Sequence, residues 1–426
     1  MDTQKLKRFH ALVRHAYEHS PYYHRLIDER GIKLDNCQPE DFPVLTKSLL
    51  MANFDDIVTD KQLSKQAITD FLSHSTDPNE RLFNRFIVMH TSGTSGEVGY
   101  FIYSKADYRR MVRGSFRGRR PQGSTGKKRP FQWRRGRLAF YGAIGGHFGG
   151  VTSVKQMLRG PVGLFVRGEF LEVNSPLPEV LESLNRFQPD VIIGYTMGLK
   201  ILAEQQRAGV LRIDPVSISA TGESCSKADM EFLSESFDGA SIVSLYGCTE
   251  HLMMGHSNPD GETMTLFDRN LHFEFFADHT IVTNLFNYTM PLIRYRMADI
   301  IEPLTNTPGQ PLVIRNLVGR SEQMPRFVNR RGETDFISPH TINEIFVSGV
   351  ARFQFRVADE SSFTFVICLE PGLDEPARAR AVAGTEHRLQ EILQQKGLDN
   401  VKFAVKVVDD IPLNPRTGKF QLIAVN

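Results

Sequence analysis

The 426-residue sequence is poor in cysteine and contains no long apolar run. Its four cysteines are too far apart to form a CxxC metal-binding pair or a disulfide framework, which fits a reducing compartment. No charged-then-apolar leader opens the sequence, and no apolar segment approaches the ~18 residues of a membrane span. We therefore expect a cytoplasmic protein without a signal peptide or a transmembrane helix.

A Walker P-loop is also missing, because that motif needs Gly, four residues, and then Gly-Lys-Ser/Thr. The segment most similar to this motif is Gly126-Lys127-Lys128. It has Pro121 at the position of the first glycine and Lys128 at the position of the Ser or Thr. If the protein binds a nucleotide, a different architecture must hold it.

One stretch does have the composition of a phosphate-binding loop. Its hydroxyl and glycine residues lie between the apolar segments 86–89 and 100–103. Glycines let backbone N–H groups turn toward one point, and hydroxyls add further donors. A plain Ser/Gly hairpin turn would explain this segment equally well if it stood alone. The run consists of Thr91, Ser92, Gly93, Thr94, Ser95 and Gly96.

The middle of the chain alternates between short apolar runs and amphipathic segments, which predicts a parallel sheet with helical crossovers. Ligands bind at the carboxyl ends of such strands, where Gly222, Glu223 and residues 246–250 lie. Beyond about residue 320 the pattern predicts a separate small α+β unit. The expected strands are 138–141, 190–195, 216–222, 241–247, 280–285, 292–295, 353–357, 363–369 and 403–408, and the expected helices include 2–31, 181–187, 198–208, 227–236 and 375–396.

The net charge of +2 conceals a strongly basic segment. Residues 109–137 contain twelve Lys and Arg and no acidic residue, so the rest of the chain has a balance of −10. Such a strip usually has an anionic partner, although a purely solubilising loop is an alternative. Its glycines and prolines predict that helix ends near residue 113 and that an exposed loop follows.

Five short motifs occur in one order along the chain, and together they resemble the adenylate-forming (acyl-CoA synthetase-like) superfamily. Within the superfamily, the sequence most resembles the branch of phenylacetate–CoA ligase and the coenzyme F390 synthetase-related proteins. Two N-terminal segments are also typical of that branch, namely Ser20-Pro21-Tyr22-Tyr23 and Pro43-Val44-Leu45-Thr46-Lys47. The five motifs are Thr91-Ser92-Gly93-Thr94-Ser95-Gly96, Tyr246-Gly247-Cys248-Thr249-Glu250, Arg294-Tyr295-Arg296-Met297-Ala298-Asp299, Gly319-Arg320-Ser321-Glu322 and Asn414-Pro415-Arg416-Thr417-Gly418-Lys419.

The resemblance implies an α/β fold with two domains. Residues 1–319 would form a large N-terminal adenylate-forming domain with parallel sheets, which binds ATP and the acid. Residues 320–426 would form a small mobile α+β C-terminal domain carrying a catalytic lysine. A small carboxylic acid would first react with ATP and Mg²⁺ to give acyl-AMP and pyrophosphate. A thiol such as coenzyme A would then displace AMP.

The same resemblance assigns roles to individual residues. Residues 91–96 would donate to the β and γ phosphates, while Glu250 holds Mg²⁺ and Thr249 contacts the α-phosphate. Tyr246 would stack on adenine beside Gly247, Gly222 and Glu223, and Asp299 would accept the ribose hydroxyls. Arg320 and Lys419 would contact the nucleotide, and Lys419 would neutralise charge during adenylation. His147, Tyr195 and Cys248 would line the acid pocket.

The sequence alone also allows an interpretation of each of these residues without a role in binding or catalysis. Glu250 could be a solvated carboxylate at a helix N-terminus, and Asp299 could be a turn residue. Tyr246 could belong to the core, Lys419 could lie on the surface, and His147 could be structural or line a thiol tunnel.

The sequence departs from the family pattern near the site of the second half-reaction. Met297-Ala298 replaces the usual Thr-Gly, Glu322 stands where an aspartate is usual, and the segment from Gly319 to Gly332 is longer than usual. These departures make the second half-reaction the less certain one. The resemblance implies coenzyme A as the thiol acceptor; the alternative is the phosphopantetheine of an acidic acyl carrier protein, which would dock on residues 109–137. Tyrosine and glycines near the pocket favour an aryl or arylacetic acid.

A different class of function is nucleic-acid binding by the basic segment, with Phe116, Phe131 and Trp133 as stacking residues. The segment contains no recognisable nucleic-acid-binding module, which disfavours this reading.

Overall fold

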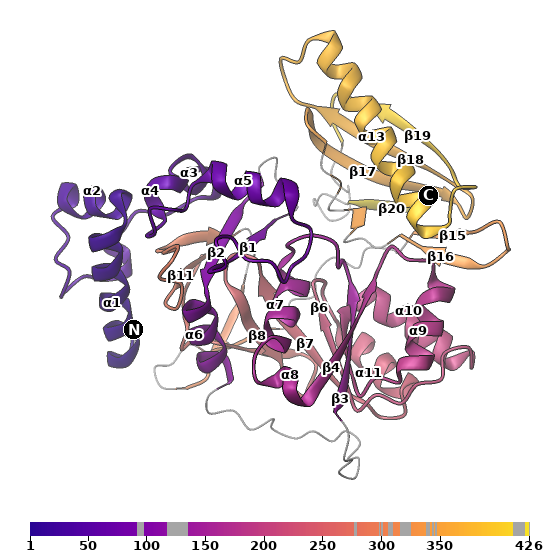
Figure 1. Cartoon of the computed structure of the whole chain (residues 1–426), viewed down its shortest axis with the longest axis horizontal. Helices are drawn as coiled ribbons and strands as arrows, with labels where there is room; N and C mark the ends of the chain where they lie inside the picture. The colour runs from indigo at the N-terminus through magenta and orange to yellow at the C-terminus, as the bar shows by residue number, and fades with distance from the viewer. Residues whose placement is uncertain are drawn as a thin grey trace.

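A computed structural model gives the fold of the chain (Figure 1). The structure describes residues 1–91, 98–116, 135–276, 279–297, 299, 301–305, 310–315, 325–337, 341–342, 345, 347–411 and 422–425. No helix among these residues is long and apolar enough to cross a membrane.

The N-terminal residues form helices, as their periodicity predicts. The expected helical region is divided at Ser20, whose side chain caps the second helix while Pro21 occupies its first turn. Buried apolar side chains of these helices pack into the same core as the hairpin described next. The helices are α1 (Thr3–His19), α2 (Pro21–Arg30), α3 (Lys47–Ala52), α4 (Phe54–Ile57) and α5 (Lys65–His74), with a short 3-10 helix at Pro39–Asp41.

Strands β1 (Phe86–His90) and β2 (Tyr100–Ser104) form an antiparallel pair in which His90 lies opposite Tyr100. The candidate phosphate loop therefore joins two strands, but residues 92–97 lie outside the described part of the chain. Helix α6 (Lys105–Phe116) follows β2 directly, and Ser104 caps it, because Asp107 N donates to Ser104 Oγ at 3.2 Å.

Helix α6 continues past the predicted stop near residue 113. A Cβ atom at Gly114 would lie 1.7 Å from Asn270 Oδ1. Gly114 therefore lets Asn270 pack closely against the helix and does not end the helix. The remainder of the basic segment, residues 117–134, lies outside the described residues.

A nine-stranded sheet forms the centre of the molecule, in the order β13-β14-β9-β8-β7-β6-β5-β3-β4. Strands β4, β3, β5, β6 and β7 are parallel, which confirms the prediction from alternating segments. From β7 to β13 the pairing is antiparallel. The strands are β3 (Gly136–Gly142), β4 (Val166–Glu172), β5 (Val191–Tyr195), β6 (Ser217–Thr221), β7 (Ser241–Cys248), β8 (Leu252–Ser257), β9 (Thr263–Leu266), β13 (Pro303–Thr305) and β14 (Val313–Arg315).

The crossover helices are α9 (Leu177–Phe187), α10 (Thr196–Arg207) and α11 (Lys227–Ser236), close to their predicted ranges. Helices α7 (Gly149–Leu158) and α8 (Val162–Phe165), together with edge strand β4, had no sequence prediction. A three-stranded sheet joins β10 (Leu271–Phe275), β11 (Thr280–Asn284) and β12 (Tyr295–Met297). The strand predicted at 292–295 was wrong in its bounds, since the strand found here is β12, which begins at Tyr295. Leu292 and Ile293 precede it and are buried beside α2, where Tyr23 Oη donates to Pro291 O.

The C-terminal region has a core of its own. Its strands form a hairpin and a four-stranded sheet in the order β19-β18-β17-β20, with α13 (Glu375–Lys396) packed on the sheet. This separate smaller sheet confirms the predicted fold class. The boundary proposed near residue 320 falls among residues outside the described part. The strands are β15 (Arg326–Val328), β16 (Thr334–Phe336), β17 (Val350–Asp359), β18 (Ser362–Leu369), β19 (Lys402–Val407) and β20 (Ile423–Val425).

Candidate active site

The carboxyl end of β6 turns sharply at Gly222, whose φ of +77° falls in the region that favours glycine. A Cβ atom at this position would lie 2.8 Å from the Tyr195 ring at the end of β5. The next residue, Glu223, accepts a hydrogen bond from Met197 N at 2.8 Å and thereby caps the first turn of α10. Gly222 therefore lies against Tyr195, and Glu223 binds the helix that follows Tyr195.

Tyr246 lies near the carboxyl end of β7, the strand that pairs with β6. The Tyr246 hydroxyl donates a hydrogen bond to Asp299 Oδ2 at 2.7 Å. Burial and the neighbouring Asp299 carboxylate raise the pKa of Tyr246 well above its usual value, so the phenol keeps its proton. The structure brings these two predicted site residues together across 53 residues of sequence. Stacking of Tyr246 on adenine stays a prediction.

Thr91 opens the candidate phosphate loop and is held in place by two donors. Its Oγ1 accepts from Gly99 N at 2.9 Å and from Lys47 Nζ at 3.1 Å. A Cβ atom at Gly99 would lie 2.9 Å from Lys47 Cε, so the glycine leaves room for the lysine stem. A fixed ammonium group therefore stands at the entrance of the loop.

Glu250 lies in the short connector that follows β7 and is half-buried. Burial raises the pKa of its carboxyl above the usual value, and Asp299 adds to this, whereas Lys47 opposes it. The carboxylate would therefore gain from a further cation close by. Thr249 lies against the start of α7, where a Cβ atom at Gly149 would be 3.2 Å from Thr249 Oγ1.

The donor set fits a nucleotide-bound Mg²⁺ better than a metal held by protein alone. Mg²⁺ is commonly bound by one or two carboxylates together with phosphate oxygens and waters. Glu250 offers one such carboxylate, and burial raises its pKa. Among the described residues, no group of three or more His, Cys, Asp or Glu side chains could hold a metal ion.

The residues predicted to line the acid pocket are all wholly or partly buried. His147 is 1% exposed, its Nε2 lies 3.0 Å from Ser75 Oγ, and burial lowers its pKa. The Tyr195 hydroxyl accepts from Ala143 N at 3.3 Å. The Cys248 Sγ lies 3.5 Å from Met254 Sδ, and burial raises the pKa of its thiol, which disfavours a thiolate nucleophile. Their place in an acid pocket stays a prediction.

Some predicted residues lie outside the described part of the chain, namely Ser92 to Gly96, Arg320 and Lys419. Conversely, the structure points to two residues that received no role from the sequence. Lys47 belongs to a segment that resembles the family, and a lysine in such a segment could have been suspected. Tyr103 gave no signal beyond an apolar strand, because its contacts are made with residues far along the chain.

No family model matches the sequence, but individual proteins are similar to it. The chain is 24% identical over 351 residues to a phenylacetate-coenzyme A ligase of Aromatoleum evansii, covering 75% of this chain and 70% of that protein. It is 20% identical over 452 aligned positions to protein CapK of Staphylococcus aureus, covering 99% of this chain and 88% of that protein.

A solved structure of 2-hydroxyisobutyryl-CoA ligase, in complex with 2-HIB-AMP and CoA in the thioesterification state, has the same fold. The TM-score is 0.60 at 19% identity, and the match covers 100% of this chain and 89% of that chain. The sequence similarity and the shared fold agree with the five ordered motifs: in sequence the chain is similar to phenylacetate-coenzyme A ligase, and it has the fold of an adenylate-forming CoA ligase.

Proposed function

We propose that the protein activates a carboxylic acid with ATP as acyl-AMP and transfers the acyl group to coenzyme A. The observation that carries this proposal is the convergence of Lys47, Thr91, Tyr246, Glu250 and Asp299 from four distant parts of the sequence. Attack of a carboxylate on the α-phosphorus brings two anions together, so a site for this reaction must supply cations and oriented donors. The cluster contains such groups.

Each half-reaction has its own requirements. In the first, a carboxylate oxygen bonds to the α-phosphorus and pyrophosphate leaves. In the second, the thiol sulfur bonds to the acyl carbon, its proton is lost, and AMP leaves. Lys47 and Thr91 would bind phosphate oxygens, Tyr246 and Asp299 would hold the nucleoside, and Glu250 would bind Mg²⁺. That ion would neutralise phosphate charge.

The C-terminal region would serve both steps by changing its position. We place the division at residues 1–319 and 320–426, with Arg320 contacting the nucleotide and Lys419 reaching the site only for adenylation. The separate core of the C-terminal region supports this division, and its movement would have to break the contacts that Lys396 and Asp335 make with residues 173–177.

The acid would be an aryl or arylacetic acid. The relative from Aromatoleum evansii is named for phenylacetate, and Tyr195 adds a ring next to the turn at Gly222. The solved ligase with the same fold is named for a small branched hydroxy acid, so the acid panel must contain both classes.

The acceptor would carry phosphate, in keeping with the basic segment 109–137. Coenzyme A carries phosphates on its nucleotide, and a carrier protein carries one on its phosphopantetheine. Replacing Arg117, Arg119, Arg120, Lys127, Lys128 and Arg129 with Gln would leave pyrophosphate exchange intact and raise the KM for the acceptor. An unchanged KM and salt dependence would identify the segment as a solubilising loop.

The decisive experiment is acid-dependent exchange of labelled pyrophosphate into ATP. Purified protein with Mg²⁺ should exchange label only when a suitable acid is present, and thioester should form after coenzyme A or a loaded carrier protein is added. Folded protein that exchanges no label across aryl, arylacetic, branched hydroxy and fatty acids would overturn the proposal.

A further inference from the structure

Tyr103 connects β2 to the short segment that carries Thr249 and Glu250. Its side chain is fully buried, and its hydroxyl donates to Thr249 O at 2.7 Å and to Glu250 O at 2.8 Å. One phenolic proton therefore serves two adjacent carbonyls. These carbonyls belong to the three-residue connector between β7, which ends at Cys248, and β8, which begins at Leu252.

The connector has a backbone that needs support. Leu252, the first residue of β8 after the connector, has a φ of +56°, a left-handed conformation that is uncommon for a residue with a side chain. Such conformations persist where the surrounding structure holds them. The tyrosine hydroxyl is one contact that holds the connector from outside the two strands.

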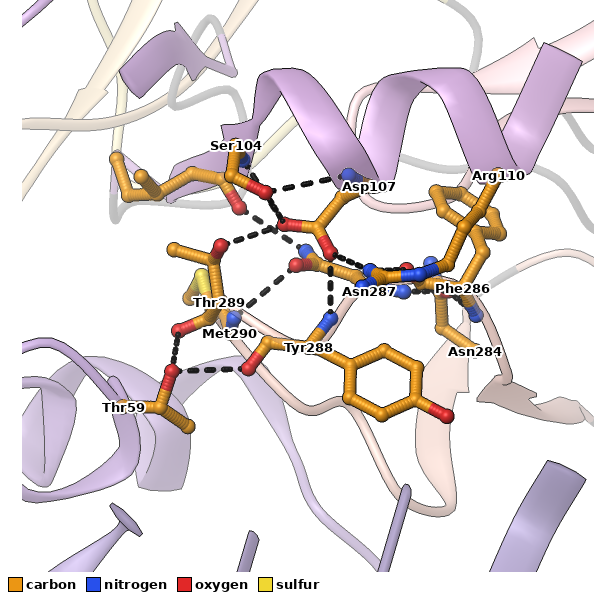
Figure 2. Close-up of polar contacts among 11 residues, drawn as sticks. Thr59, Ser104, Asp107, Arg110, Asn284, Phe286, Asn287, Tyr288, Thr289 and Met290 are labelled. Carbon is orange, nitrogen blue, oxygen red and sulfur yellow. Dashed lines mark hydrogen bonds and ion pairs between the residues drawn. The ribbon is translucent and has the colours of Figure 1, made fainter. Parts of the chain in front are cut away.

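A buried polar network at the junction of β2 and α6 binds the residues on either side of Tyr103 (Figure 2). The centre of the network is Asp107, which is 1% exposed and accepts from Ser104 Oγ at 2.6 Å and from Tyr288 N at 3.0 Å. Asn287 Nδ2 donates to Ile102 O at 3.0 Å, next to Tyr103 in the strand. The network therefore fixes residues 286–290 against the end of β2.

The same loop provides the surface on which the tyrosine ring rests. The rings of Phe286 and Tyr103 are stacked, with centroids 6.2 Å apart and planes 19° from parallel. A hydroxyl donor on a ring held in this way can set the position of the two carbonyls.

From these contacts we propose that Tyr103 is a positioning residue for metal–nucleotide binding. By holding the carbonyls of Thr249 and Glu250, it directs the Glu250 carboxylate and the Thr249 hydroxyl toward the metal and the α-phosphate. This inference rests on the proposed function, because it takes Glu250 as the metal ligand. Partners of this kind, one step removed from the metal, typically change metal affinity by about 10–100-fold when they are lost.

The test is the substitution Tyr103→Phe, which removes only the hydroxyl. Mn²⁺ binding to the full chain is titrated by electron paramagnetic resonance in the presence of a non-hydrolysable ATP analogue. The Kd for Mn²⁺ should rise by about 10-fold or more, within the range expected for a lost supporting contact. Hydrogen exchange at the amides of residues 249–252 should also become faster.

A matched control is Tyr108→Phe on α6. The Tyr108 hydroxyl donates to Ser153 O at 2.7 Å, so this variant also loses one phenol-to-carbonyl hydrogen bond but leaves the 249–251 connector untouched. Its thermal stability should fall while its Kd for Mn²⁺ stays that of the wild type. If Tyr103→Phe behaves in the same way, Tyr103 has a structural role only and the inference is overturned.

Two further outcomes are informative. If Tyr103→Phe does not fold, the variant Phe286→Leu is tested instead. It keeps the Tyr103 hydroxyl but removes the ring that stacks on Tyr103, and it should raise the Kd for Mn²⁺ by a smaller factor. No weakening in Phe286→Leu would then overturn the inference. Wild-type protein that binds ATP analogue and Mn²⁺ separately but not together would overturn the proposed metal role of Glu250, and the positioning role of Tyr103 with it.

Discussion

The Lys396 ammonium lies 2.9 Å from Asp335 Oδ1, and the two side chains are 0% and 3% exposed. Both residues belong to the C-terminal region, yet three of their other hydrogen bonds are made with the N-terminal part. Lys396 Nζ donates to Val173 O and Ser175 O at 3.0 Å, and Asp335 Oδ2 accepts from Leu177 N at 2.9 Å. The pair thus joins the two parts of the chain.

Replacing Lys396 with Met should strongly destabilise the protein. Burial lowers the pKa of Lys396 whereas Asp335 raises it, and removing the lysine would leave the Asp335 carboxylate buried without its cation. Breaking one partner of a buried pair costs about 3–5 kcal/mol. Denaturant unfolding of Lys396→Met, and of the double variant Lys396→Met/Asp335→Asn, measures the effect. The double variant should recover part of the loss, and equal losses in both would contradict the pair as the cause.

Replacing Lys47 with Met should weaken ATP binding. The substitution removes a cation that touches Thr91 and acts on Glu250, so phosphate oxygens would lose a charged partner. A hydrogen bond to a charged group contributes about 1.5–3 kcal/mol, which corresponds to a rise of roughly 10-fold or more in the KM for ATP. Steady-state pyrophosphate exchange measures it, with Lys61→Met at an exposed position as the control. A KM equal to that of the control would exclude Lys47 from the ATP site.

Replacing Lys419 with Ala should separate the two half-reactions. Loss of one oriented charge at a transition state lowers a rate by about 10²-fold or more, so adenylation should slow to that extent. Thioester formation from supplied acyl-AMP should be spared, because the proposed movement takes Lys419 away from the site for that step. The two rates are measured separately in single-turnover assays. Equal slowing of both would argue against two positions of the C-terminal region.

Stability should depend on pH through His272. Burial, with the positive charges of Lys5, the N-terminus and Arg294, lowers the pKa of His272 to about 3. A histidine in an unfolded chain has a pKa of about 6.5. Below that pH, His272 is therefore protonated in the unfolded chain but stays neutral in the folded chain. Stability should therefore fall as the pH falls from about 6.5 toward about 3, by up to about 1.4 kcal/mol per pH unit from this residue.

The variant His272→Gln tests this origin of the slope. Denaturant unfolding at about pH 7.5 gives the constant effect of the substitution, because neither side chain is then charged in either state. At about pH 5 the variant should lose less stability than the wild type. Parallel curves for the two proteins across this range would assign the acid sensitivity to other groups.

The sequence by itself determined the elements whose signals are local. Helix α11 and helix α13 have the predicted bounds, because apolar spacing and capping residues such as Ser226 and Asp374 act within one turn. The parallel core of the sheet followed from alternating segments. The ordered motifs indicated which residues would gather at the ends of the strands, and Tyr246 and Asp299 do meet there.

Only the tertiary structure decided the elements and contacts that depend on distant neighbours. Helix α7 and strand β4 lacked a clear pattern, and Leu292 is buried by packing on the N-terminal helices without belonging to a strand. Lys47 beside Thr91, Tyr103 beneath Glu250 and Lys396 beside Asp335 join residues 44, 147 and 61 positions apart. A sequence pattern reports on spacing within one element, whereas a buried charge or hydroxyl is placed by whichever segments pack around it and exclude water.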